Sequence, residues 1–401
     1  MITPHALEPD VSVSIGTKKG SSYIRAFALT LALMGSLLPP IGGVSMAAFG
    51  ILVALLLMAV DLVRYLPVVH PVVFYCLGLF SLLSISVIWT DPPNEYGRGK
   101  LLSLLTSTLF TALLAVLIHR KQDLDTLANV WPLLVLPIAI AAVLSFEGGR
   151  ATAFGSNPIW VARALATGVM FILWQLWYST APFISAKSIT RAGMALLLIV
   201  GILLTGSRGP LLGLLVGAAF LITFSNVQKT WRLLVLSYLV IAALAVLVGS
   251  GIVSSSRIFS SDGSGRGELL ATSFDVIAHF PGGVGIGNIG EYWESHQNYP
   301  HNIFVEVTAE HGWIVGIIFA GFVLNTLIRV LRHSVREKYV MIVGASLLIE
   351  FVNVNVSGDL NARTFYLFLM LSLWVLFLEK KERKHAIGVH QNQLSSPRQQ
   401  P

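Results

Sequence analysis

Charged residues are scarce in this sequence, and their scarcity argues against a soluble fold. Only 12% of the 401 residues are Asp, Glu, Lys or Arg, while 55% are hydrophobic and the mean hydropathy is +0.75. Soluble domains carry about 25% charged residues. The composition therefore predicts an integral membrane protein. The formal net charge of +7 does not indicate a nucleic-acid partner, because the basic residues gather in loops on one side of the predicted membrane.

Cysteine is almost absent as well. Cys76 is the only one and lies within an apolar run, which excludes a disulfide framework, a CxxC redox pair and a cysteine-based metal site. The first 22 residues are polar and lack an apolar stretch followed by a small-residue cleavage site. We therefore expect no cleaved signal peptide.

Apolar windows long enough to cross a membrane recur along the whole chain. A bilayer core of about 30 Å requires about 20 mostly apolar residues per helix. This spacing predicts an all-α protein with about 12 transmembrane helices. They fall near residues 24–40, 43–62, 67–89, 101–118, 127–145, 159–178, 192–206, 209–224, 232–252, 303–328, 339–356 and 362–378.

The distribution of Lys and Arg predicts the orientation of these helices, because basic residues are retained on the cytoplasmic side. With a cytoplasmic N-terminus, eight basic residues lie outside, and 19 of the 27 remain inside. The eight are Arg98, Lys100, Arg150, Arg163, Arg208, Arg257, Arg266 and Arg363.

This orientation divides the chain into five segments. They are a cytoplasmic tail (1–22), helices one to nine (23–252), a periplasmic loop (253–302), helices ten to twelve (303–378) and a basic cytoplasmic tail (379–401). The part of that tail after His385 is polar and rich in Gln, so we expect it to be disordered.

The periplasmic loop is about fifty residues long, which is too long for a simple connection in a compact protein. Residues Gly267 to Phe280 have apolar side chains at helical spacing, and Pro281-Gly282-Gly283 follows them. We therefore expect an amphipathic helix at the membrane surface.

Three arginines stand on the outward side close to this loop. Arg257 and Arg266 flank its beginning, and Arg208 lies at the outer end of a predicted span. A guanidinium near hydrocarbon is costly without an anionic partner, and its forked donors bind phosphate oxygens in pairs. Snorkelling to lipid headgroups accounts for one such arginine. Three of them, with few acidic residues nearby, favour a lipid diphosphate as the ligand.

His301 lies where the loop returns to the membrane, directly after Pro300. Proline is frequent in the first turn of a helix or its approach, so we expect His301 at a helix N-terminus. The helix dipole there keeps the imidazole neutral and able to accept a proton near pH 7. A general base is the functional interpretation, and a hydrogen-bonded structural histidine fits the position equally well.

Two other patterns resemble ligand sites. Residues 285–290 match the glycine spacing of a dinucleotide-binding turn, but no strand precedes them, so we interpret them as turns. Glu294, His296 and His301 could suggest zinc, yet their spacing matches no standard site. We expect no metal and no cofactor.

Glycines at positions 209, 213 and 217 repeat every four residues on one predicted span. This spacing places them on one face of a helix, where it favours close packing against a second helix. Acidic and basic residues within 91–98 could orient a hydroxylated substrate, although a solvated loop surface explains them as well.

Five motifs follow one another in the second half of the chain. They are TGSRG at 205–209, two arginines nine residues apart, FPGGVGIGN at 280–288, PHN followed by Phe304, and HGWIVG at 311–316. In this order they resemble the O-antigen ligase and polymerase superfamily of bacterial envelopes, most strongly between residues 205 and 316.

The resemblance implies a GT-C-like, inverting and metal-independent glycosyltransferase of the bacterial inner membrane, with its active site facing the periplasm. In the ligase branch, a polysaccharide on undecaprenyl diphosphate is transferred to a sugar hydroxyl of lipid A-core. By motif, His301 would be the base, and Arg208 and Arg266 would bind the diphosphate, with Arg257 as a further candidate. The implied partners are the lipid-linked donor, the lipid A-core acceptor and membrane lipid.

Three enzymes share this donor chemistry: a ligase, a polymerase and a protein-glycosylating ligase. Chain length, compact loops and basic balance favour the ligase, since its acceptor is phosphorylated. A transporter of lipid-linked sugars is a more distant alternative. It would place charged or polar residues at mid-membrane, for which Glu306, Glu310, Glu350 and Asn353 are candidates.

Overall fold

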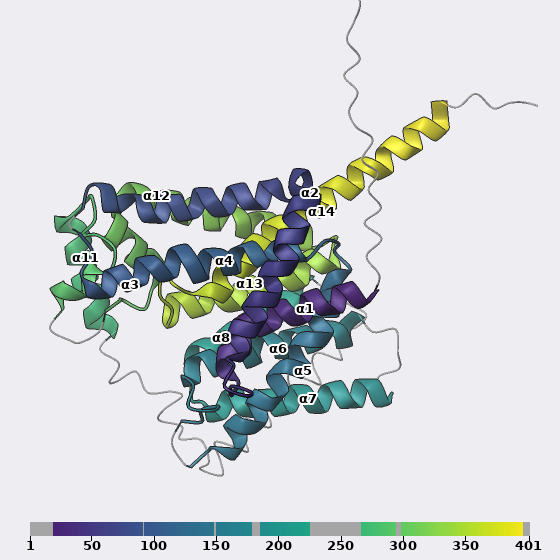
Figure 1. Ribbon diagram of the computed structural model, residues 1–401, viewed down its shortest axis with the longest axis horizontal. Helices are drawn as coiled ribbons and strands as arrows, with labels where there is room; N and C mark the ends of the chain where they lie inside the picture. The colour runs from purple at the N-terminus through teal and green to yellow at the C-terminus, as the bar shows by residue number, and fades with distance from the viewer. Residues whose placement is uncertain are drawn as a thin grey trace, which may run out of the picture.

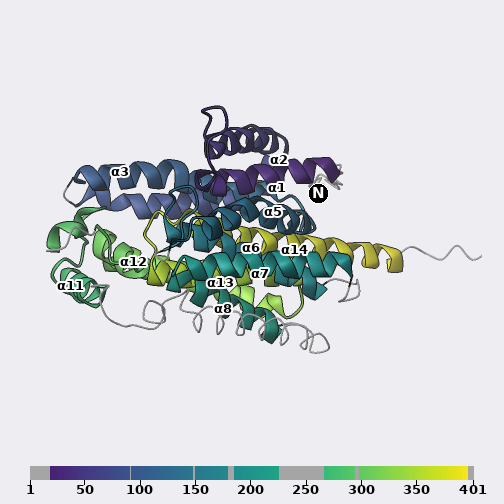
Figure 2. The same ribbon diagram turned by 90° about the horizontal axis from the view of Figure 1, so that it is seen from below.

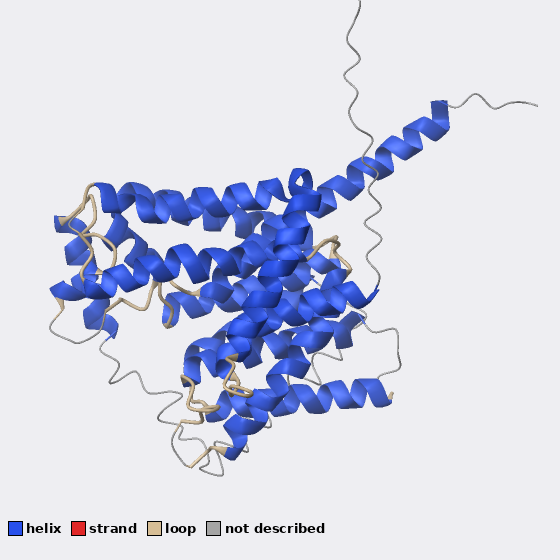
Figure 3. Cartoon of the chain, viewed as in Figure 1, coloured by secondary structure: helices blue, strands red, loops and turns tan. Residues whose placement is uncertain are grey.

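The computed structural model describes residues 19–90, 92–147, 150–178, 185–224, 266–293 and 298–395. Within these ranges the chain is helical and forms no strand (Figure 3), which confirms the all-α prediction. The helices are α1 (Lys19–Met34), α2 (Met46–Ser84), α3 (Glu95–Ser103), α4 (Leu109–Leu113), α5 (Asp123–Leu144), α6 (Pro158–Tyr178), α7 (Ala186–Leu204), α8 (Arg208–Phe224), α11 (Arg266–His279), α12 (Ile303–Ser334), α13 (Lys338–Val356) and α14 (Arg363–Ser395). A π-turn at Leu104–Thr108 joins α3 to α4.

Seven helical segments of the described chain are long and apolar enough to cross a membrane. Two shorter apolar helices, Met46–Asp61 and Arg208–Phe224, accompany them. Each predicted span that the structure describes corresponds to a helix, while the span at 232–252 lies outside the described residues. The chain is thus a multi-pass membrane protein, and the count of twelve spans stays a prediction.

The predicted spans at 43–62 and 67–89 both lie largely in α2, as the apolar segments Met46–Asp61 and Pro71–Ile88, and the chain stays helical between them. Figure 1 shows the two arms of α2 meeting at a bend, and Pro71 begins the second apolar arm. A proline inside a helix removes one hydrogen bond and bends the axis without ending the helix.

The prediction for the C-terminal tail is wrong. Disorder was expected after His385, but α14 continues to Ser395. Lys, Glu, Arg and Ala favour helix, and the first proline of this tail is Pro397. The helix therefore ends only shortly before a residue that could not continue it.

The described ends of the chain lie at the same end of the bundle. Figures 1 and 2 show the beginning of α1 and the end of α14 on one side, whereas α11 lies on the opposite side. The placement of both tails on one side of the membrane and of the 253–302 loop on the other stays a prediction. We call the end that carries α11 the loop end.

Helices α8 and α13 pack with almost no space between their backbones. A Cβ atom at Gly213 would lie 2.8 Å from the carbonyl oxygen of Ile349, and one at Gly217 would lie 3.1 Å from that of Ala345. The predicted role of the glycine repeat in close helix packing is confirmed.

We expect Gly213→Ala to destabilise the protein by about 1–3 kcal/mol, because the new methyl group would overlap backbone atoms of α13. The measurement is the midpoint of thermal unfolding in detergent. Gly193→Ala is the matched control, since a Cβ at Gly193 of α7 meets no atom within 4 Å. Equal stability of the two variants would contradict the close approach.

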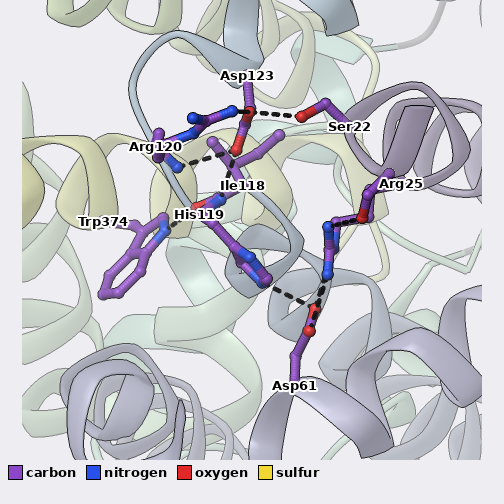
Figure 4. A network of polar contacts seen from close by, with 9 residues as sticks. Ser22, Arg25, Asp61, Ile118, His119, Arg120, Asp123 and Trp374 are labelled. Atoms are coloured by element: carbon purple, nitrogen blue, oxygen red, sulfur yellow. Dashed lines mark hydrogen bonds and ion pairs between the residues drawn. The ribbon is translucent and has the colours of Figure 1, made fainter. Parts of the chain in front are cut away.

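A buried polar network lies at the end of the bundle opposite α11. Figure 4 shows its side chains from close by. Arg25 of α1 donates to both carboxylate oxygens of Asp61 on α2, at 3.2 and 3.0 Å, and His119 Nε2 lies 2.8 Å from the same carboxylate. Asp123 accepts from Ser22 Oγ at 2.8 Å and from the backbone N–H of His119 at 3.1 Å. The network joins α1, α2 and α5, and every carboxylate oxygen in it is hydrogen-bonded.

Candidate functional site

A break in α12 lies where this helix contacts the loop. Gly312 has φ 85° and ψ 171°, so the helix is interrupted there and two helices meet at a kink. The N–H of Trp313, which would have donated to Ala309 in a regular helix, donates to the carbonyl of Pro281 at 3.1 Å. The N–H of Val284 donates to the carbonyl of Ala309 at 2.9 Å. The backbone N–H and C=O groups that lose their helical partners at the kink therefore form hydrogen bonds with the loop.

The glycines of residues 281–288 make this docking possible. A Cβ at Gly283 would lie 2.6 Å from the carbonyl oxygen of Glu310, and one at Gly312 would lie 2.7 Å from the carbonyl oxygen of Pro281. Gly285 and Gly287 have φ of 91° and 77°, a region that non-glycine residues seldom adopt. The interpretation of this glycine pattern as turns is confirmed, and its role is to hold the loop against α12.

The same segment is also tied to α3. The side-chain oxygen of Asn288 accepts from the N–H of Asn94 at 3.0 Å, and Asn94 caps α3 by accepting from the N–H of Gly97 at 2.7 Å. A Cβ at Gly97 would lie 2.2 Å from the carbonyl oxygen of Ile286. Loop, α3 and α12 therefore form one connected unit.

A buried ionic triad lies within this unit. Lys100 of α3 forms ion pairs with Glu306 and Glu310 of α12, the latter at 2.5 Å, and all three side chains are buried. Next along α12, Nδ1 of the buried His311 lies 2.6 Å from Ser86 Oγ. These contacts link the first turns of α12 to α3 and to the segment that follows α2.

His301 lies directly before this anchored part of α12. Asn302 caps the helix, and its side-chain oxygen accepts from the N–H groups of Phe304 and Val305, both at 3.1 Å. His301 is half-buried, and its ring meets that of Tyr299 edge-on with 4.6 Å between centroids. The expected position at a helix N-terminus is confirmed, one residue before the cap.

The backbone of His301 is strained, which the sequence did not indicate. Its φ is 59°, and the left-handed conformation costs a non-glycine residue about 1–2 kcal/mol. Such strain persists where surrounding contacts impose it, and it is concentrated at functional sites. The Asn302 cap and the Tyr299 ring are among the contacts around this residue.

Arg208 is the first residue of α8, and its side chain is exposed. It lines a pocket of about 200 Å³ whose walls are mostly apolar, with Leu211, Leu212 and Leu215 among them. A cation beside an apolar pocket suits an amphipathic ligand with an anionic head.

The last turn of α13 lies next to both Arg208 and His301. Asn302, the neighbour of His301, donates from Nδ2 to the carbonyl of Asn355 at 3.5 Å. A Cβ at Gly209, the neighbour of Arg208, would lie 2.9 Å from Oγ of Ser357. The neighbours of two candidate residues almost a hundred positions apart therefore lie against the same short segment at the end of α13.

Of the two loop arginines, Arg266 lies at the beginning of a helix. Arg266 is the first residue of α11, whose predicted existence between residues 267 and 280 is confirmed, while Arg257 lies outside the described residues. Val276 and Ile277 of α11 pack in one apolar cluster with Val305 and Ala309 of α12. This packing joins α11 to the helix that begins beside His301.

A second ionic pair was not predicted. Arg163 of α6 donates from Nε to Glu350 Oε2 of α13 at 3.1 Å, and Thr364 Oγ1 donates to the same oxygen at 2.7 Å. The carboxylates considered for a transporter, Glu350 among them, are thus partnered by Lys100 or Arg163 within the fold. Each of these carboxylates therefore has a counter-charge within the fold.

The connection between α13 and α14 adds a further carboxylate. Burial raises the pKa of Asp359 above its usual range, and the charges of Lys100 and Arg163 oppose this rise. Asp359 also acts electrostatically on Arg363. The connection therefore brings an acidic and a basic side chain to the loop end.

Metal ligands do not gather in the part of the chain that the structure describes. No group of three His, Cys, Asp or Glu side chains there could hold an ion. Of the residues considered for zinc, Glu294 and His296 lie outside the described ranges.

Comparison with protein families identifies the segment that contains these residues. Residues 193–320 match the family model described as O-antigen ligase. This match supports the O-antigen ligase and polymerase superfamily. The resemblance predicted from the motifs is confirmed over a segment that holds α8, α11, the glycine loop and the kink of α12.

Members of the O-antigen ligase superfamily are glycosyltransferase-like enzymes, either ligases or polymerases, and their substrates are lipid-linked glycans and lipid acceptors. Comparison with curated proteins and with solved structures finds no match. The function is therefore inferred from the family match and from the geometry of the loop end.

Proposed function

We propose that this protein is an O-antigen ligase of the bacterial inner membrane. It transfers a polysaccharide from undecaprenyl diphosphate to a sugar hydroxyl of lipid A-core, with inversion, without a metal, and on the periplasmic side. A GT-C-like arrangement of helices belongs to the same proposal. An O-antigen polymerase and a protein-glycosylating ligase are the alternatives that share its donor.

One observation carries this proposal: the last turn of α13 meets the neighbours of both His301 and Arg208. A basic imidazole and an arginine are the two groups that transfer from a sugar diphosphate requires. The arginine stabilises the negative charge of the departing diphosphate, and the imidazole removes one proton from the nucleophile.

The reaction follows from these roles. His301 accepts the proton of the acceptor hydroxyl, and the hydroxyl oxygen forms a bond to the anomeric carbon of the donor sugar. The bond from that carbon to the diphosphate oxygen breaks, and the electron pair leaves with undecaprenyl diphosphate. A single displacement of this kind inverts the anomeric centre. The proton on His301 passes to solvent or to the leaving diphosphate.

The environment of Arg208 supports a lipid diphosphate as the donor. Helix N-termini attract anions through their free N–H groups and dipole, and Arg208 is the first residue of α8. The leucine-lined pocket beside it suits the first isoprenoid units of the carrier. In this proposal Arg266, at the beginning of α11, binds the same diphosphate, and Arg257 assists.

Reconstitution tests the function directly. The protein in liposomes receives undecaprenyl-diphosphate glycan and either lipid A-core or a second donor molecule, and gels show which acceptor becomes longer. Extension of lipid A-core supports the ligase. Extension of the donor alone identifies a polymerase, and extension of neither contradicts both.

We expect Arg208→Ala and Arg266→Ala each to weaken donor binding about 10- to 100-fold, because hydrogen bonds to charged groups contribute about 1.5–3 kcal/mol. The measurement is the dissociation constant for undecaprenyl-diphosphate glycan in detergent. Arg208→Lys keeps the charge but loses the forked geometry, so we expect an intermediate value.

Arg332→Ala is the matched control, since Arg332 is an exposed arginine near the far end of α12. Its donor affinity should equal that of the unchanged protein. If Arg208→Ala and Arg266→Ala also bind the donor normally, these arginines serve only as headgroup anchors.

A further inference from the structure

A second cavity lies at the loop end, apart from the pocket beside Arg208. It measures about 360 Å³ and lies between the end of α1, α3, α6 and the connection from α13 to α14. Small-molecule sites usually measure about 300–1,000 Å³. Nothing in the proposed chemistry of His301 and Arg208 uses this cavity.

The lining combines one aromatic surface with several hydroxyl, amide and carboxylate groups. Trp160 of α6 lines it, and this side chain is 58% exposed. Ser36, Ser103, Asp359 and Asn361 contribute polar atoms to the wall. Among the described residues, Asn361 Oδ1 is a buried acceptor with no hydrogen-bond partner, and such an atom favours a ligand that donates to it.

The cavity wall carries a carboxyl group as well as arginines, which favours a sugar over a diphosphate. Arg163 already forms an ion pair with Glu350, and Asp359 and Arg363 both line the wall. A diphosphate would need cations in excess, whereas a neutral saccharide needs matched donors and acceptors. The exposed indole suits the apolar C–H face of a sugar ring, which packs flat against an aromatic surface.

We propose that this cavity is a saccharide subsite, in which Trp160 supports one sugar ring while Asn361 and Asp359 accept from its hydroxyls. The inference rests on the proposed function, which supplies two saccharides, the acceptor core and the donor glycan. The connection that holds Asp359 and Asn361 in the cavity wall begins after Asn355, which accepts from Asn302 beside His301, so the subsite and His301 share this connection.

Transfer kinetics test the subsite and distinguish its occupant. We expect Trp160→Ala to raise the KM of one substrate about tenfold, the equivalent of about 1.4 kcal/mol, while kcat changes less than about twofold. Asn361→Ala should raise the KM of the same substrate, and Trp160→Phe should restore most of the loss. A raised KM for lipid A-core identifies the acceptor as occupant, and a raised KM for the lipid-linked donor identifies the donor glycan.

A binding measurement tests the subsite without requiring that the protein transfers a glycan. Lipid-free core oligosaccharide and lipid-free donor polysaccharide are each added to the protein in detergent, and the thermal shift is recorded, because a ligand of the folded state raises the midpoint. One of the two glycans should stabilise the unchanged protein and fail to stabilise Trp160→Ala. This arm remains decisive even if no transfer to any acceptor is seen.

Phe49→Ala is the control for loss of an exposed aromatic ring, since Phe49 of α2 is 44% exposed and does not line the cavity. It should keep both KM values and the thermal shift. Unchanged KM values for both substrates in Trp160→Ala and Asn361→Ala, with unchanged shifts for both glycans, would overturn the proposal. Elution of each variant as a single folded species in detergent is required before either comparison.

Discussion

His301→Ala should lower the rate of glycan transfer by about 10²–10⁴-fold, the contribution of a positioned general base. In our proposal the acceptor hydroxyl has no other proton acceptor placed beside the anomeric carbon. Donor binding should change little, because the diphosphate is held by arginines. The measurement is the initial rate with undecaprenyl-diphosphate glycan and lipid A-core, together with the donor dissociation constant.

The strained backbone at His301 calls for a second variant. Alanine at φ 59° carries the same strain as histidine, and a shift of the chain could reduce activity without any role for the imidazole. Asn adopts the left-handed region more readily than most residues but has no basic group. His301→Asn should therefore keep the local fold and still lose activity. Transfer at the normal rate in His301→Asn would remove this residue from the chemistry.

Much of the fold could be predicted because hydropathy and helix length depend on local sequence. Helices α5, α6, α7 and α13 each begin and end within about six residues of the predicted spans. The helical continuity of α2 between its two spans was not predicted, because a charged residue and two prolines resemble a loop in sequence. Hydropathy alone does not distinguish a bent helix from two separate ones.

The site could be predicted only in part. His301 and Arg208 belong to short motifs, so their residue types and neighbours indicate them directly. Arg163 and Glu350 are 187 positions apart, and no local pattern joins them. The kink at Gly312 was also missed, because a single glycine in an apolar run reads as an ordinary helical residue. Its contact with Pro281 becomes visible only in three dimensions.

The triad of Lys100, Glu306 and Glu310 leads to the second large effect. We expect Lys100→Met to destabilise the protein by about 3–5 kcal/mol, because removing one partner leaves buried carboxylates without their counter-charge. Since Glu306 lies one turn after the Asn302 cap, the loss should also loosen the start of α12 and reduce transfer. The measurements are the unfolding midpoint in detergent and the transfer rate at a temperature where the variant remains folded.

Two comparisons separate the triad from a general effect of losing a cation. Arg98→Met removes an exposed cation of the same helix and should change stability by about 0.5 kcal/mol or less. The triple variant Lys100→Met, Glu306→Gln and Glu310→Gln removes the counter-charges together, and it should recover most of the lost stability because no carboxylate remains unpaired. If the triple variant is less stable than Lys100→Met, the carboxylates stabilise α12 independently of Lys100. The ion pairs would then not be the contacts that hold α3 against α12.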